Sequence, residues 1–178
     1  MLRIDPASNE VTQLMRKGAA LEMRSPLPGH DRLSAPRLSK PIPRWRLHLD
    51  LNAQGVSLAA ALLVGWRSFV FDPDTLFAID VSRVKRGLAV SGVSRGKSVE
   101  GMIAALLAAE RTVGDDEAEV RFVSVPTALF RGVWVIGSAW NGIVELKERG
   151  RAAGSYVPLA EVERDLEERV SMSGRRST

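Results

Sequence analysis

Hydrophobic and polar residues alternate along two stretches of the chain, and this pattern predicts β-strands there. Residues 45–51 (WRLHLDL) place Trp or Leu at every second position, which is typical of a strand with one buried face. Residues 76–84 do the same with Phe77, Ile79 and Val81. Shorter strands are expected at 67–71, 88–90, 120–125, 130–136 and 143–146. The apolar run 56–64 fits either a helix or a buried strand, because its alanines favour a helix and its length favours a strand.

Apolar residues spaced three or four positions apart predict helices in three other stretches. The strongest helix is expected at 98–111, with Ser98 as a cap for its first turn. A second is expected at 10–23, with Asn9 as its N-cap, and a third at 158–170. Helices are therefore few and well separated along the chain.

Short turn signals join the expected strands. They are Asp72-Pro73-Asp74, Lys85-Arg86-Gly87 and Asn141-Gly142, and an adjacent Asn-Gly pair is a favoured hairpin turn. Strands that follow one another through short turns favour antiparallel pairing. The pattern predicts an α+β fold: a single domain with a mostly antiparallel sheet packed by one main helix, plus N- and C-terminal helices.

Composition divides this chain into four expected segments. Residues 1–24 form an N-terminal helical segment, and residues 25–43 form a basic linker that holds five of the nine prolines. Residues 44–172 form the α+β domain, and residues 173–178 form a disordered tail. The linker is expected to be extended and solvated.

The residue inventory excludes several kinds of chemistry. The 178 residues include no cysteine, which rules out disulfides, cysteine-ligated zinc, iron–sulfur clusters and thiol catalysis. The two histidines, His30 and His48, have no carboxylates at metal-ligand spacing, so no metal or cofactor is expected. The first residues lack the apolar core of a signal peptide, and the run 51–66 is too short to span a membrane. A cytoplasmic location is the expectation.

Positive charge is concentrated in the first half of the chain. The net charge is +4 and the pI is about 9.9, which favours an anionic partner without requiring one. The cations of the proline-rich arm and the strand that follows it are Arg32, Arg37, Lys40, Arg44 and Arg46. Contact of this arm with nucleic acid is one hypothesis for the function, and a solvated linker is the alternative.

Residues 87–101 (GLAVSGVSRGKSVEG) imitate several active sites. The G-x-S-x-G pattern around Ser94 is typical of a hydrolase nucleophile, but no histidine follows Ser94 to take its proton. Ser94 and Lys97 also fit S-x-x-K, without the further motifs that such enzymes need. Gly96-Lys97-Ser98 resembles the end of a phosphate-binding loop that is one residue too short.

What remains of this segment is a candidate anion site at the start of a helix. Its residues are Gly92, Arg95, Gly96, Lys97 and Ser98. The alternative is a glycine-rich turn whose charges are only solvated. An enzyme that handles a phosphorylated small molecule at this turn is the third hypothesis for the function.

Aromatic residues offer one more route to a partner. Trp45, Trp66 and Trp134 lie in apolar strand patterns and are interpreted as core, although rings beside arginines can also stack bases. Trp140 is expected to be the most exposed and to contact a partner.

The leading hypothesis is a bacterial-type interaction protein without catalysis, with an adaptor, regulatory or structural role. Its partner would be another protein or a second copy of itself, because short strands with free edges and a charged C-terminal helix are common recruiting surfaces. The alternatives are the nucleic-acid binder and the phosphate-handling enzyme described above. No membrane partner is expected.

Overall fold

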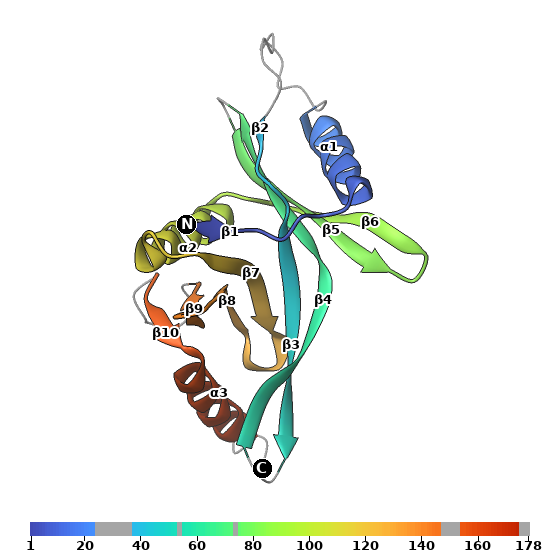
Figure 1. The fold of residues 1–178 in the computed structure, drawn as a ribbon. Helices are drawn as coiled ribbons and strands as arrows, with labels where there is room; N and C mark the ends of the chain where they lie inside the picture. Colours follow the sequence, from blue (N-terminus) through green and yellow to red (C-terminus); the bar gives the residue numbers. More distant parts are fainter. Residues whose placement is uncertain (24–36, 53–54, 73–74, 147–153, 175–178) are drawn as a thin grey trace. The chain divides into compact units, whose positions relative to one another are not determined.

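The computed structural model describes residues 1–23, 37–52, 55–72, 75–146 and 154–174 (Figure 1). In these ranges the chain forms three α-helices and ten strands, in the order β10-β9-β8-β7-β3-β4-β5-β6, with β1 beside β7 and β2 beside β4. Of the described strand pairs, β1–β7 and β3–β7 are parallel and the others are antiparallel. The predicted α+β class with a mostly antiparallel sheet is confirmed.

Contacts divide the chain into two compact units, and each is described by itself. Unit 1 comprises residues 1–3, 44–63 and 101–178, and unit 2 comprises residues 4–43 and 64–100. The α1 helix belongs to the second unit together with strands β5 and β6. This helix packs within its unit against those strands.

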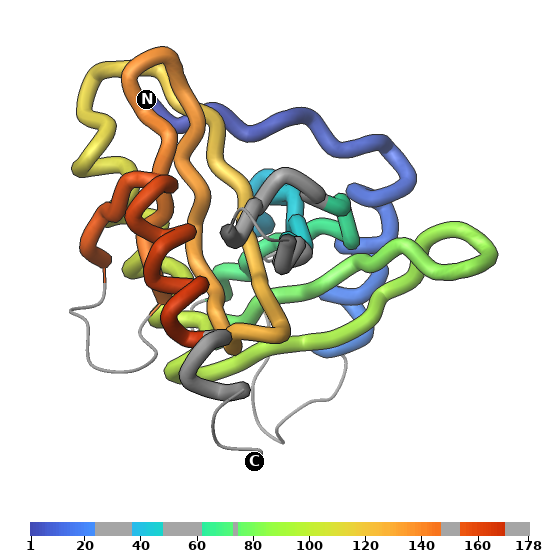
Figure 2. The backbone as a smooth tube through the Cα atoms, turned by 90° about the horizontal axis from the view of Figure 1, so that it is seen from below, coloured from blue at the N-terminus to red at the C-terminus, as the bar shows by residue number. Residues whose placement is uncertain are grey.

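Unit 1 is built around the antiparallel strands β7 to β10. Its main elements are β1 (Leu2–Arg3), most of β3 (Ile42–Asn52), most of α2 (Lys97–Val113), β7 (Ala118–Val125), the 3-10 turn η1 (Pro126–Ala128), β8 (Phe130–Gly137), β9 (Asn141–Glu145), β10 (Tyr156–Pro158) and α3 (Leu159–Gly174). The first turn of α2 and the first two residues of β3 belong to unit 2. The α3 helix packs beside β9, β10 and the turn η1 (Figure 2). Its buried Val162 and Leu166 pack with Leu47, Phe130 and Ile143, so the apolar stripe of the helix covers one face of these strands.

Unit 2 places one helix on a three-stranded hairpin array. Its elements are α1 (Asn9–Met23), β2 (Arg37–Leu38), the second half of β4 (Gly55–Asp72), β5 (Thr75–Val84) and β6 (Gly87–Arg95). The strand expected at 76–84 is present as β5, and its Phe77, Ile79 and Val81 are buried with α1 residues. The expected alternation of buried and exposed positions is wrong, because Ala78 and Asp80 between them are buried as well. The helix starts one residue earlier than predicted, since the Ser8 hydroxyl accepts the N–H of Val11 (3.3 Å).

Three expectations about local structure need correction. The ambiguous run 56–64 and the strand 67–71 form one strand, β4. The second half of the expected linker, residues 37–43, contains β2 and the first two residues of β3; the rest of that linker and the tip Pro73-Asp74 lie outside the described residues. The helix α3 runs to Gly174, so the start of the expected tail is helical.

The predicted Asn141-Gly142 turn is wrong, because both residues lie inside β9. The turn falls three residues earlier: Gly137 and Trp140 exchange backbone hydrogen bonds (2.7 and 3.3 Å) around the two-residue loop 138–139. Gly142 is needed for a close approach, since a Cβ there would lie 2.5 Å from the Val157 carbonyl oxygen. Packing against β10 therefore explains this glycine, where the sequence had indicated a turn.

The close pairing of β4 with β5 leaves no room for a side chain at Gly65, and this can be tested. A Cβ at this position would overlap the carbonyl oxygen of Val81, so we expect Gly65→Ala to lower the free energy of unfolding by about 1–3 kcal/mol. Gly101→Ala is the matched control, because its Cβ would meet nothing within 4 Å and alanine stabilises a helix by about 1 kcal/mol relative to glycine. Urea denaturation of the two variants should move the midpoint in opposite directions.

Candidate functional site

The segment that imitated several active sites is mainly a strand. The β6 strand runs from Gly87 to Arg95, and α2 begins at Lys97, so the turn between them is Gly96 alone. Gly96 has a φ of +61°, a conformation that favours glycine, and its carbonyl accepts the N–H groups of Val99 (2.9 Å) and Glu100 (3.1 Å). Gly92 lies within the strand, opposite Asp80.

The five residues of the candidate anion site do not converge on one position. The Arg95 guanidinium pairs with the Glu22 carboxylate of α1 (2.6 Å) and lies 5.6 Å from the Phe77 ring centroid. Lys97 and Ser98 are exposed in the first turn of α2, while Gly92 faces the side of β6 opposite to Arg95. Anion binding at this turn stays a prediction that rests mainly on Lys97.

Ser94 has no activating partner among the described side chains, where none of the hydrogen bonds joins its hydroxyl to a carboxylate or an imidazole. The acid closest to it in strand register, Asp80, is buried and accepts two hydrogen bonds from Arg67, both at 2.6 Å. This carboxylate was expected to face water. It instead neutralises an arginine inside the unit, and it is not available as a base.

The basic arm of the sequence is spread over different elements. Arg37 is exposed in β2, Lys40 is exposed just before β3, Arg46 is exposed in β3 and Arg44 is half-buried. Arg32 lies outside the described residues. Residues 37–46 are therefore largely sheet where an extended arm was expected, and nucleic-acid contact by these cations stays a prediction.

Two of the tryptophans interpreted as core instead flank an arginine. The Arg121 guanidinium lies 4.7 Å from the Trp45 ring centroid and 5.8 Å from that of Trp134, and it donates hydrogen bonds to both carboxylate oxygens of Glu119. Both rings are half-buried and pack on the Leu47 cluster. This contact stabilises Arg121 within the sheet by cation–π attraction.

Trp140, expected to be the exposed contact residue, is half-buried. Its indole N–H donates to Asp116 (3.1 Å), and its ring meets the Tyr156 ring edge-to-face at 5.5 Å. The side chain thus connects the β8–β9 turn to β10 and the acidic loop. Its contacts are accounted for within unit 1.

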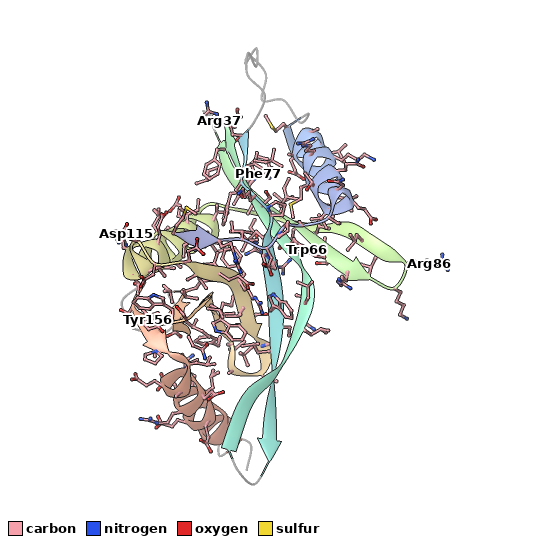
Figure 3. The ribbon with its side chains drawn as sticks, in the orientation of Figure 1. Arg37, Trp66, Phe77, Arg86, Asp115 and Tyr156 are labelled. Atoms are coloured by element: carbon pink, nitrogen blue, oxygen red, sulfur yellow. The ribbon has the colours of Figure 1, made fainter. Side chains whose placement is uncertain are left out.

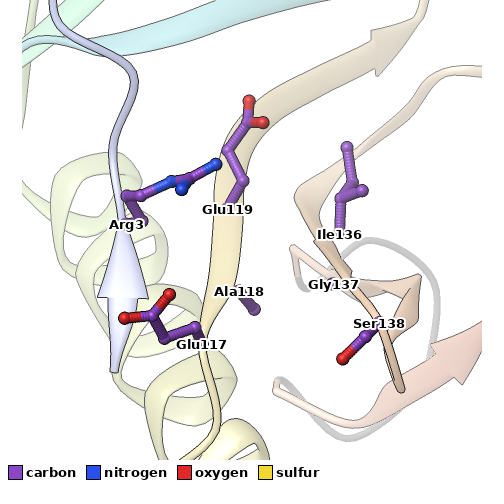
Figure 4. A pocket seen from close by; sticks show the side chains of 7 residues that line it. All are labelled: Arg3, Glu117, Ala118, Glu119, Ile136, Gly137 and Ser138. Atoms are coloured by element: carbon purple, nitrogen blue, oxygen red, sulfur yellow. The ribbon is translucent and has the colours of Figure 1, made fainter.

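A pocket of about 270 Å³ opens beside β1, β7 and β8 (Figure 4). Its lining residues are Arg3, Glu117, Ala118, Glu119, Ile136, Gly137 and Ser138. Glu119 is already bound to Arg121, so the pocket offers one cation, one carboxylate and one hydroxyl. In the described residues no three His, Asp or Glu side chains gather as a metal site requires.

The surface that sequence reasoning missed is the outer edge of β6. None of its nine residues is buried, whereas five consecutive residues of β5 are. Among the described strands β6 pairs with β5 alone, at the end of the strand order. A register shift at Ser91, whose hydroxyl contacts that of Ser82 (2.6 Å), breaks the alternation of apolar residues. That bulge is why the pattern predicted a strand only as far as Val90.

Comparison of the chain with protein families, with curated proteins and with solved structures gives no match. None of the helices in the described ranges has the length and apolar character that a bilayer crossing requires. The function proposed below therefore rests on the geometry of this chain.

The two arginine–carboxylate pairs of unit 2 should contribute differently to the free energy of unfolding. Arg67 and Asp80 are almost enclosed, with side-chain exposures of 14% and 12%, whereas Arg95 and Glu22 are at 61% and 34%. We expect Asp80→Ala to cost about 3–5 kcal/mol, because it strands a buried guanidinium, and Glu22→Ala to cost less than about 1 kcal/mol. Equal shifts in the urea unfolding midpoint would contradict this ranking.

Proposed function

We propose that this chain is a non-catalytic interaction protein that binds another protein along the outer edge of β6. The observation that carries the proposal is the position of this strand at the end of the sheet, where none of its nine residues is fully buried. Its neighbour β5 is held on the α1 side by a buried apolar cluster. The edge is thus supported by a rigid strand and is open to an incoming one.

Strand addition supplies the binding energy. An edge strand presents alternate backbone N–H and C=O groups, which an extended segment of a partner can satisfy. Each hydrogen bond formed in this way contributes about 0.5–1.5 kcal/mol. A segment of four to six residues would bind moderately and reversibly, as suits an adaptor or a regulatory protein. We place this interaction in the cytoplasm.

The two other functions considered for the sequence have less support from the side-chain contacts. The phosphate-handling turn has its arginine engaged by Glu22, and Arg44 of the nucleic-acid arm is half-buried in β3. The crosslinking experiment below can give results that favour either of these functions over the proposal.

A photo-crosslinking residue at Ser94 tests the proposal in cells. We expect a covalent adduct with one defined protein, because Ser94 lies in the edge strand, and no such adduct from the same residue placed at Ala104, an exposed position of α2. An adduct with nucleic acid, identical adducts from both positions, or no protein adduct from Ser94 would each overturn the proposal.

Two single proline variants, Val93→Pro and Ser94→Pro, distinguish a loss of binding at the strand edge from a loss of the fold. Successive residues of an antiparallel strand direct their N–H groups to opposite edges, so one proline breaks the ladder with β5 and the other removes only an outward donor. For this experiment the crosslinking residue is placed at Ala89, because Ser94 is itself substituted. Of the two proline variants, we expect the one that keeps the wild-type melting temperature to lose the protein adduct. Retention of the adduct by that variant would contradict strand addition.

A further inference from the structure

Exposed cations lie at both ends of β6. Arg83, Lys85 and Arg86 surround the β5–β6 turn, which extends beyond α1 with Arg86 at its tip (Figure 3). At the opposite end of the strand, Lys97 is exposed, whereas Arg95 beside it is already paired with Glu22. The two cationic ends are separated by the length of the strand, about 30 Å for nine residues.

No acidic side chain is exposed between these ends. Asp80 is the only Asp or Glu from position 75 to position 99, and it is buried against Arg67. Over its described residues unit 2 carries ten Lys and Arg against six Asp and Glu. The hairpin end of the β6 edge is therefore the more positive, and at the other end Glu22 offsets Arg95 and leaves the charge of Lys97.

The middle of the strand is small and apolar. Residues 88–93 read LAVSGV; Val90 is 39% exposed, and a Cβ at Gly92 would meet nothing within 4 Å. A partner segment can approach this part of the edge closely. It would meet apolar side chains and backbone there, and charge only at the ends.

A second copy of β6 is a poor occupant of this edge. Pairing two copies in either orientation would place cations of one strand beside cations of the other, which is unfavourable. The bulge at Ser91 also twists the edge away from flat pairing. Charge and geometry both disfavour self-association here, and both allow a separate peptide.

We infer that the partner segment is an extended acidic peptide with carboxylates near both of its ends and small or β-branched residues between them. The inference rests on the proposed function and adds the chemistry of the ligand. The central residues supply the backbone ladder and the terminal carboxylates meet the two cationic ends. The pattern fixes how far apart the acidic groups lie, about seven to nine residues.

Selection from a phage-displayed library of random twelve-residue peptides on the full-length protein tests this inference. We expect the selected peptides to carry Asp or Glu near both ends, and their binding, measured by fluorescence anisotropy, to weaken with salt. The charge reversal K85E/R86E should weaken binding roughly tenfold. The matched control R16E/K17E reverses two exposed cations of α1 and should leave binding unchanged.

The outcomes distinguish this inference from the proposed function. Selected peptides without acidic ends, whose binding is still lost in the stable proline variant of β6, would overturn the charge pattern and leave strand addition standing. Selected peptides that bind the proline variant as tightly as the wild-type protein would overturn both the charge pattern and strand addition. Binding of a DNA or RNA oligonucleotide that displaces the acidic peptides and is lost in K85E/R86E would replace the peptide with nucleic acid. A concentration-dependent dimer that K85E/R86E abolishes would overturn the argument against self-pairing.

Discussion

The packing of α1 on one face of β5 is the contact on which the candidate binding surface depends. Val11, Met15 and Ala19 bury the apolar side chains of β5 almost completely, and apolar burial of this kind is the main favourable term in folding. Leu88 and Val93 of β6 pack on the same cluster, so one face of the outer strand is anchored as well. The outer edge of β6 is thus held in position before any partner arrives.

The ion pair between Arg67 and Asp80 shapes the electrostatics of the same unit. A buried carboxylate without a partner would be costly, and the two-pronged geometry of this pair makes its burial tolerable. The pairing also removes the one acidic group of the hairpin from the surface. The cations at the hairpin tip and at the start of α2 consequently act on solvent and on partners without an opposing charge in the strand.

Several arginines in the described part of the chain are bound by its own residues. Arg121 lies beside two indole rings and binds Glu119, Arg169 binds the buried Glu145 (3.0 Å), and Arg95 is held by Glu22. An excess of arginine over lysine therefore does not by itself indicate a surface for phosphate. The cations of the hairpin tip are exposed, which is why the ligand chemistry is argued from them.

Local patterns were enough to predict strands at 45–51 and 76–84, the three helices and the α+β class, because each depends on side-chain periodicity within a few residues. The extent of β6, the strand character of residues 37–38 and the position of the β8–β9 turn depend on pairing with distant segments. A bulge at Ser91 and a close approach at Gly142 disturb the periodicity on which sequence reasoning relies. The burial of Asp80 and the pairing of Arg95 were equally invisible in the sequence, since the charges that meet there come from elements up to 73 residues apart.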